Sequence, residues 1–169
     1  MISFLVSFVS KSSVFMPWLI KSEPDVFSIH DLEKVGQEPW SGVRNYQARN
    51  FMWRDMKVGD RALFYHSNAK PPGIAGVAKV ASTPYPDPTQ FDKKSEYFDP
   101  AATEEKPRWY LVDFEHVTTF KELLPLETLK ADKTLSEMLV CKKGTRLSIT
   151  PVEKKFFARA LKMAGCGAL

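Results

Sequence analysis

The sequence predicts an α+β fold, in which a small mixed β-barrel of about five to six strands is flanked by short helices. Three observations support this fold class. About five β-prone segments are interrupted by helix-like segments, without the regular alternation of a parallel sheet. The chain contains no internal repeat and no low-complexity tract. Its 169 residues, 44% of them hydrophobic, suffice for one domain with a real core.

The first strand is predicted in residues 18–24, WLIKSEP. The segment begins β-prone and apolar, and Pro24 stops it. A strand that ends in polar residues often delivers them to a rim. Here those residues are Lys21, Ser22 and Glu23.

Two helices are expected before the next strand. Ser28 is a good N-cap for the first, Asp31 completes a capping box, and Gly36 can end the helix. Residues 37–40, QEPW, are predicted to be a linker. Asn45 can cap the second helix. Four of its residues fall on one buried face: Ala48, Phe51, Met52 and Met56.

Two strands are predicted on either side of a proline-containing loop. Residues 61–67, RALFYHS, are apolar on both faces, which is typical of a central strand. Residues 74–82, IAGVAKVAS, form the next strand, and Gly76 predicts a bulge or a tight bend there. Residues 83–92 contain three prolines and should not form regular structure. This acidic loop runs on to Pro107.

The C-terminal part is predicted to hold the longest strand and the clearest helix. Residues 108–120, RWYLVDFEHVTTF, form that strand, and short helices follow in residues 124–131 and 135–141. Residues 145–149 form the last strand. The final helix is indicated by its capping residues, which are Thr150, Pro151, Glu153 and Gly165.

The charge of the chain is mildly basic and unevenly distributed. The formal net charge is +4, which permits an anionic partner without requiring one. Residues 142–162 hold seven basic side chains and one acid, whereas residues 85–105 hold six acids and two lysines. The basic segment is either a solvated helix face or a rim that faces phosphates.

The N-terminal residues and the cysteines bear on where the protein works. Residues 2–9 are apolar but too short to span a bilayer, and they lack the flanks of a signal peptide. We expect residues 1–15 to be an extension outside the fold, a single domain over residues 16–165, and no membrane partner. Cys141 and Cys166 are isolated, which indicates a reducing compartment. A reducing compartment makes the cytoplasm the expected location, and no clear basic targeting run indicates the nucleus instead.

Motifs for catalysis, cofactors and metals are missing from the sequence. It has no P-loop, no glycine-rich dinucleotide motif, no G-x-S-x-G and no H-E-x-x-H. His30, His66 and His116 are scattered and have no metal-ligand spacing. We therefore expect a protein that is not an enzyme and needs no cofactor and no metal.

A binding pocket better explains residues 40–50, WSGVRNYQARN. The segment combines aromatic rings, amides and guanidinium groups, and only Val43 and Ala48 are plain aliphatics. Aromatic faces can stack on a base, hydroxyl and amide groups can read its edge, and cations can hold phosphates. Polar and aromatic residues also end two predicted strands, and such ends can converge at the mouth of a small barrel. This combination suits an unstacked or flipped-out base.

Structural explanations stay open for several of these residues. Trp18 and Trp109 are expected in the core, and Trp53 is expected in the core or at an interface. Arg44 can pair with an acid inside the fold, and His66 can be a structural histidine. Tyr46 can cap the barrel, and residues 45–47 can simply start a helix.

Six motifs resemble the EVE-domain family. They are WLIKSEP, WSGVRNYQARNFM, MKVGDRALFYHSN, PGIAGVAKV, YPDPTQFD and PRWYLVDFEHV, and they occur in the family's order. The resemblance covers about residues 17–163, and six linked motifs are far more specific than any single one. It implies a PUA-like fold, a pseudo-barrel flanked by helices that is related to YTH domains.

The resemblance also implies a function. In this superfamily a pocket at the barrel receives a modified nucleobase. The expected partner is therefore DNA or RNA that carries a modified base, with modified cytosine or another pyrimidine as the leading choice and a monomer as the default state. Three alternatives remain: a pocket for a small molecule such as a free nucleoside, a component of an RNA-processing enzyme, and a protein-interaction domain.

The expected site follows from the matching positions and from the residue types. Trp40 or Tyr46 would stack on the base, main-chain groups of residues 41–43 would bond its edge, and Lys21 and Arg44 would add positive charge. The YPDP loop would form a wall. The full set of ligand-binding candidates is Lys21, Ser22, Trp40, Ser41, Gly42, Val43, Arg44, Asn45, Tyr46, Tyr65, His66, Ser67, Tyr85 and Pro86.

Overall fold

The computed structural model describes residues 16–167 and residue 169. The strands are β1 (Trp18–Ser22), β2 (Gln37–Pro39), β3 (Arg61–His66), β4 (Gly73–Val80), β5 (Tyr85–Pro86), β6 (Tyr110–Leu111), β7 (Asp113–Pro125) and β8 (Ile149–Pro151). The α-helices are α1 (Ile29–Val35), α2 (Tyr46–Asn50), α3 (Leu126–Ala131) and α4 (Lys154–Met163). A π-helical turn, η1 (Phe51–Asp55), continues α2, and 3₁₀ turns form η2 (Pro88–Gln90), η3 (Leu135–Glu137) and η4 (Leu139–Cys141). The extension predicted in residues 1–15 lies outside the described residues and stays a prediction.

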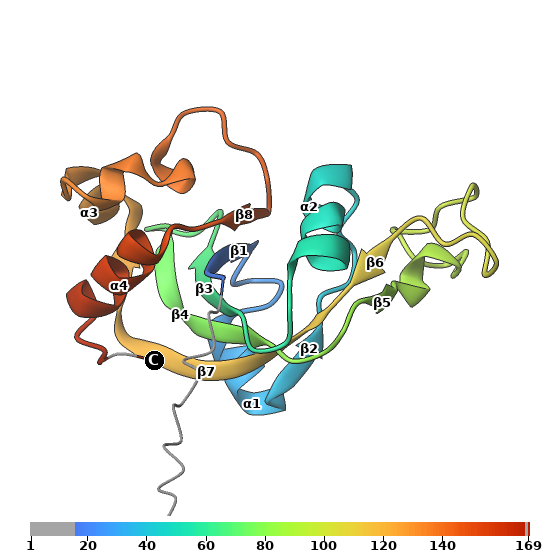
Figure 1. The fold of residues 1–169 in the computed structure, drawn as a ribbon, viewed down its shortest axis with the longest axis horizontal. Helices are drawn as coiled ribbons and strands as arrows, with labels where there is room; N and C mark the ends of the chain where they lie inside the picture. Colours follow the sequence, from blue (N-terminus) through green and yellow to red (C-terminus); the bar gives the residue numbers. More distant parts are fainter. Residues whose placement is uncertain (1–15, 168) are drawn as a thin grey trace, which may run out of the picture.

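Six strands form one mixed sheet that curls into a half-barrel (Figure 1). Their order is β2-β7-β4-β3-β1-β8. β1 and β3 run parallel, and the other neighbours run antiparallel. β5 and β6 pair separately in an arm at one side of the sheet (Figure 1). The predicted fold class is therefore confirmed, and β3 has the central position expected of residues 61–67.

A glycine bends the sheet where β4 crosses β7. The register of this pair shifts between Ile74 and Gly76, and the pairing of β3 with β4 also shifts. A Cβ atom added to Gly76 would lie 2.4 Å from the carbonyl oxygen of Thr118 and 2.9 Å from a side-chain carbon of Ile29. Only glycine allows so close an approach of the two strands. The bend predicted from Gly76 is confirmed.

The two faces of the sheet carry two separate cores. Side chains alternate between the faces of a strand. In β1, Trp18 and Ile20 pack into the core that α1 and α2 share, whereas Leu19 packs into the core that α3 and α4 share. Figure 1 shows α3 and α4 together at one end of the molecule, and α2 on the other side of β1, next to the arm that carries β5 and β6. The sheet therefore separates two environments, and the candidate site belongs to the α1 and α2 side.

The predicted helix starts of α1 and α2 are confirmed in atomic detail. The Ser28 hydroxyl accepts the Asp31 N–H at 3.1 Å, and the Asp31 carboxylate accepts the Ser28 N–H at 2.9 Å. The Asn45 side-chain oxygen accepts the N–H groups of Gln47 at 2.9 Å and Ala48 at 3.1 Å. These bonds satisfy N–H groups that a helix leaves free at its start.

Several predicted boundaries are wrong because strand pairing overrides local signals. Residues 37–39 are not a linker but form β2 against β7. The proline-rich residues 83–92 contain β5 and a 3₁₀ turn. Thr150 and Pro151 do not cap α4, because they pair with β1 as part of β8. The proline fits there because β8 is an edge strand.

Two further segments are divided differently from the prediction. Residues 108–120 were predicted as one strand, but the chain breaks at Val112 into β6 and β7, and β7 runs on to Pro125. This break separates the arm from the main sheet. Residues 135–141 form two 3₁₀ turns rather than a helix.

Candidate functional site

A cavity of about 530 Å³ lies between the end of β1, the loop before α1 and the crossover from β2 to α2. This volume is in the usual range of ligand pockets. Its lining mixes apolar, hydroxyl and charged side chains. Seven of the predicted site residues line it: Lys21, Ser22, Trp40, Ser41, Gly42, Val43 and Arg44.

Asp87 anchors the crossover from inside the fold. Its side chain is 2% exposed, and one oxygen accepts the Gly42 N–H at 2.9 Å and Arg44 Nη1 at 2.8 Å. The other oxygen accepts the N–H of Thr89 at 2.9 Å and its hydroxyl at 2.6 Å. Burial acts to raise the pKa of Asp87, but these hydrogen bonds outweigh it and hold the pKa below its usual value. An ionised carboxylate of the YPDP loop thus fixes the position of residues 42–44.

Tyr97 closes the cavity over the same segment. Gly42 has a φ of 81°, and a Cβ atom there would lie 2.7 Å from the Tyr97 ring. The Tyr97 carbonyl accepts two hydrogen bonds from Arg44, at 2.9 and 2.6 Å. The Arg44 guanidinium also lies 5.4 Å from the centre of the Tyr97 ring. Arg44 therefore does pair with an acid inside the fold, and it holds one wall of the cavity in place.

Trp40 forms the back of the cavity rather than its mouth. Its side chain is buried, and Phe64 and Phe114 meet it edge-to-face with ring centres at 5.7 and 5.4 Å. Phe27 meets it in the same way at 6.3 Å. Trp40 therefore serves both the core and the cavity, while Phe27 and Tyr97 supply the remaining aromatic lining.

Most donors around the crossover already have partners. The N–H groups of Trp40, Ser41 and Gly42 donate to acceptors within the fold. The Ser22 hydroxyl donates to a carbonyl of the loop before α1 at 2.7 Å. Among the described residues, no acceptor is found for the Val43 N–H. Of the main-chain donors that residues 41–43 were expected to offer to a ligand, only the Val43 N–H is therefore still available.

Lys21 supplies a cation at the rim. Its ammonium donates to the carbonyl of Thr145 at 3.3 Å, and burial lowers its pKa. It forms no ion pair with any carboxylate in residues 16–167. Its charge is therefore available to an anionic ligand.

The structure places the other seven predicted residues away from the lining of this cavity: Asn45, Tyr46, Tyr65, His66, Ser67, Tyr85 and Pro86. Asn45 is occupied as the cap of α2. Tyr46 is 49% exposed and stacks on Trp109, at 4.9 Å between ring centres. Tyr65 packs into the core on the opposite face of the sheet, because neighbours in a strand point to opposite sides.

The remaining four of these residues have structural roles. The buried His66 accepts the N–H of Ile29 with Nε2 at 3.1 Å, and burial, assisted by His30, lowers its pKa. The Ser67 N–H donates to the carbonyl of Ser22. The Tyr85 hydroxyl donates to Asp113, and Pro86 pairs within the arm. The alternative prediction, that His66 is a structural histidine, is confirmed.

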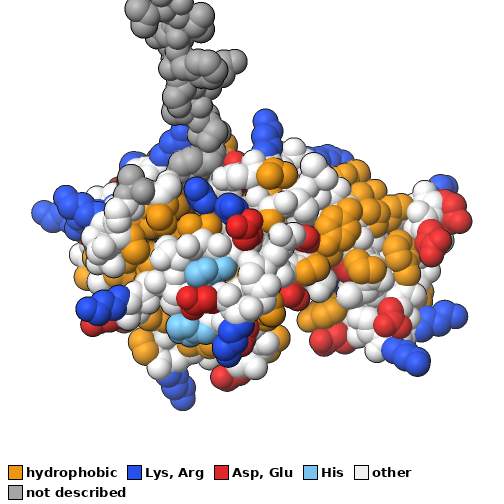
Figure 2. Space-filling view, turned by 90° about the horizontal axis from the view of Figure 1, so that it is seen from below, with side chains coloured by type: hydrophobic (Ala, Val, Ile, Leu, Met, Phe, Trp, Pro, Cys, Tyr) orange, Lys and Arg blue, Asp and Glu red, His pale blue; other side chains and the backbone are white. Residues whose placement is uncertain are grey.

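Sequence reasoning missed the other half of the lining: Val26, Phe27, Glu38, Pro39, Glu96, Tyr97 and Ser148. For Tyr97 a signal was present. A solvent loop rarely carries aromatic residues without a use, which is the criterion that singled out residues 40–50. Applied to the acidic loop, the criterion marks Tyr97 together with Tyr85, Phe91 and Phe98, so it indicates the loop without singling out Tyr97. Hydrophobic side chains gather at the surface on the side of the molecule that carries the arm of β5 and β6, with acidic and basic side chains around them (Figure 2).

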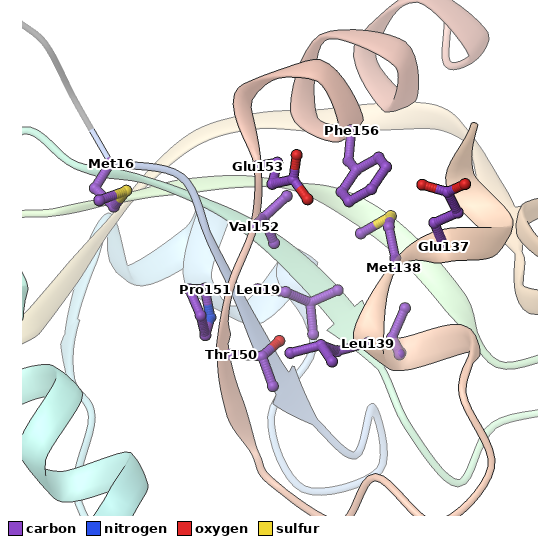
Figure 3. Close-up of a pocket in the computed structure, with 11 residues that line it drawn as sticks. Met16, Leu19, Glu137, Met138, Leu139, Thr150, Pro151, Val152, Glu153 and Phe156 are labelled. Carbon is purple, nitrogen blue, oxygen red and sulfur yellow. The ribbon is translucent and has the colours of Figure 1, made fainter.

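A second cavity, of about 350 Å³, lies near the other end of the molecule, among β8, the start of α4 and the η3 and η4 turns (Figure 3). Its lining is mostly apolar and includes Leu19, Met138 and Phe156. The carboxylates of Glu137 and Glu153 flank Phe156 (Figure 3). Two carboxylates and few donors make this cavity unsuited to a polyanion.

Within the described residues, the structure holds neither a candidate metal centre nor a candidate membrane span. No group of three or more histidine, cysteine or acidic side chains could hold a metal ion there. None of the helices that the structure describes is both long and apolar enough to cross a bilayer.

Comparison with known proteins decides the family, because residues 17–163 match the EVE domain. The chain belongs to the EVE-domain family. Human thymocyte nuclear protein 1 is 42% identical to it over 164 residues, which cover 86% of this chain and 72% of the human protein. The mouse and zebrafish proteins of that name are 48% identical over 67% of this chain. This EVE domain spans only about half of their length, 54% and 53%.

Solved structures of relatives share the fold. A hypothetical protein from Leishmania major is 48% identical, with a TM-score of 0.84 over 89% of this chain and 95% of that one. The human THYN1 protein, solved in complex with DNA that contains 5-methylcytosine, is 40% identical, with a TM-score of 0.82 over 90% of this chain and 99% of that one. The predicted family and its PUA-like fold are confirmed.

Proposed function

We propose that this EVE domain is a non-enzymatic module that binds DNA and reads a modified cytosine in the cavity at the end of β1. The observation that carries the proposal is the human THYN1 protein in complex with DNA that contains 5-methylcytosine, which shares this fold at 40% identity. The location of the cavity supports it, because residues 40–44, which belong to one of the six motifs that resemble the family, line the cavity.

The lining suits an unstacked base. Phe27, Trp40 and Tyr97 offer aromatic surface, and stacking on such surface stabilises a bound base by about 1–3 kcal/mol. The Val43 side chain and its free N–H bring an apolar contact for a methyl group next to a donor for the edge of the base. Lys21 at the rim would attract a phosphate of the extruded nucleotide.

The test is direct binding to matched oligonucleotides. Single- and double-stranded DNA and the corresponding RNA would carry one cytosine, 5-methylcytosine or 5-hydroxymethylcytosine, and the Kd would be measured by fluorescence anisotropy. We expect tighter binding of modified DNA. Tyr97→Ala should weaken the binding of modified DNA about 5- to 100-fold and so reduce that preference, because it removes an exposed ring and keeps the carbonyl that holds Arg44.

The matched control is Leu139→Ala, which truncates an exposed apolar side chain at the other cavity and should leave the preference unchanged. Equal Kd values for plain and modified DNA would refute the proposal. Tighter binding of modified RNA than of modified DNA would mean that RNA, and not DNA, is the partner. Chemical turnover of any oligonucleotide would contradict the non-enzymatic assignment.

A further inference from the structure

A ladder of arginines and aromatic rings runs from the cavity along α2 and η1. β6 lies beside these helical turns (Figure 1). We name this surface the arginine–aromatic ladder, and its members are Tyr46, Arg49, Trp53, Arg54, Arg108, Trp109 and Tyr110.

Two ring stacks form the frame of the ladder. Tyr46 lies on Trp109 with ring centres 4.9 Å apart and an angle of 18° between the ring planes. Trp53 lies on Tyr110 at 4.3 Å and 5°. The helical turns bring Tyr46, Arg49 and Trp53 to one face, at spacings of three and four residues. The frame is therefore set by backbone geometry and holds its side chains in fixed places.

Guanidinium groups fill the spaces between the rings. Arg49 lies 5.0 Å from the centre of Tyr46 and 5.3 Å from that of Trp53. Arg54 lies 4.8 Å from Trp53 on the outer side. Arg108 donates a hydrogen bond to the Tyr46 hydroxyl. Arg49 donates from Nε to the Asn50 side-chain oxygen at 3.0 Å and from Nη1 to the Arg108 carbonyl. Because a stacked guanidinium keeps its edge exposed, its Nη2 group can still bind an oxygen anion.

The ladder is continuous with the cavity. Arg44, which lines the cavity, lies 5.3 Å from the centre of the Trp109 ring. Trp109 in turn carries Tyr46, and Arg49 lies against both of these rings. A strand whose base enters the cavity therefore has a path across the ladder.

The positive charge of the ladder is largely uncompensated. Within residues 16–167, neither Arg49 nor Arg54 forms an ion pair, and Arg108 has one carboxylate, Asp99, at 3.7 Å. Burial lowers the pKa of Arg49, and the charge of Arg54 lowers it further. Arginine on aromatic rings is also ordinary packing. What points to a ligand is the combination of unpaired charge, the exposed Tyr46 and Arg54, and contact with the cavity.

We propose that the arginine–aromatic ladder binds the phosphates next to the nucleotide whose base occupies the cavity, with Arg49 and Arg54 as the phosphate contacts. This inference rests on the proposed function. It assigns affinity to the ladder and base discrimination to the cavity, because phosphate contacts are independent of sequence.

The experiment measures the Kd of the double variant Arg49→Gln/Arg54→Gln for duplex DNA with one 5-methylcytosine, at several salt concentrations. Each phosphate contact to duplex DNA contributes about 0.9 to the slope of log affinity against log salt. We expect the slope to fall by about two and the affinity to fall about tenfold or more at low salt. The ratio of Kd values for plain and modified DNA should not change.

Two further variants make the result specific. Arg49→Lys/Arg54→Lys keeps both charges and should retain the salt slope. Lys121→Gln/Lys133→Gln removes two exposed charges, one in β7 and one just after α3, and should leave both the slope and the affinity close to those of the natural chain. Thermal unfolding of each variant establishes that it is folded.

The outcomes separate the two proposals. An unchanged salt slope in the glutamine variant overturns the ladder, even if the natural chain prefers modified DNA. If the glutamine variant loses the preference for modified DNA but keeps the salt slope, Arg49 and Arg54 read the base and do not bind phosphates. That outcome also overturns the ladder. If the natural chain binds plain and modified DNA alike but the slope still falls by two, the ladder stands and the proposed function fails. Absence of any DNA binding overturns both.

Discussion

The wall of the cavity and the arginine–aromatic ladder both hold arginines against aromatic rings, yet they treat the charge in opposite ways. The charge of Arg44 in the wall is neutralised by the buried Asp87, and Arg44 also donates to the carbonyl of Tyr97. Arg49 and Arg54 in the ladder have no carboxylate partner in the part of the chain that the structure describes. A compensated arginine shapes a surface, whereas an uncompensated one remains able to bind an anion. The following variants test that division, beginning with the largest effect.

Asp87→Ala should cost the most stability. It leaves the Arg44 charge half-buried without its partner and removes acceptors from Gly42 and Thr89. Breaking one partner of a buried pair costs about 3–5 kcal/mol. Urea denaturation at pH 7 would measure the free energy of unfolding. Glu115→Ala, which breaks the exposed pair with Lys79, is the control, and it should cost about 0–1 kcal/mol. Equal losses in the two variants would mean that Asp87 does not anchor the wall.

Gly42→Ala should have an intermediate effect on stability and a specific effect on binding. The alanine would need an unfavourable positive φ, which costs about 1–2 kcal/mol, and its Cβ would push the Tyr97 ring out of place. We expect a weaker preference for modified DNA, measured as a ratio of Kd values.

The matched control for Gly42 is Gly36→Ala. Gly36 has a φ of 80°, but a Cβ atom there would meet nothing within 4 Å. It should therefore show a similar backbone cost and keep the modification preference. If both variants bind DNA identically, contact between Gly42 and Tyr97 does not shape the site.

The sequence correctly predicts those elements of the fold whose position depends on residues close to them in the chain. The Asn45 cap, the central strand of residues 61–67 and the bend at Gly76 depend on side chains within a few residues or on burial of both faces. Thr150 and Pro151 carry an equally good local signal for a helix start, but pairing with β1 takes them into β8. A capping pattern cannot reveal that a neighbouring strand has an open edge.

The same limit applies to the site. Residues 40–44 were found because they are contiguous and have an unusual composition. Tyr65 and His66 end a strand, which predicts a place at the site, but the Tyr65 side chain enters the opposite core and His66 accepts a main-chain N–H. Tyr97 comes from a loop more than 50 residues away in sequence, and no periodicity could bring it to Gly42. The half of the cavity that depends on this loop becomes visible only in three dimensions.

Tyr46→Leu should lower the stability less than Asp87→Ala and Gly42→Ala do. It also tests whether the exposed Tyr46 ring contacts the base. The leucine removes the stack on Trp109 and the acceptor of Arg108 but no charge. Aromatic pairs stabilise a fold by about 0.5–1.5 kcal/mol beyond their buried area, so a loss of about 1 kcal/mol in the free energy of unfolding is expected. Because Arg49 and Arg54 remain, the salt slope of DNA binding should stay unchanged and the affinity should fall only a few-fold. A fall larger than that of Arg49→Gln/Arg54→Gln, with loss of the preference for modified DNA, would instead identify Tyr46 as a ring that stacks on the base. In that case the division between a cavity that discriminates and a ladder that holds phosphates would have to be abandoned.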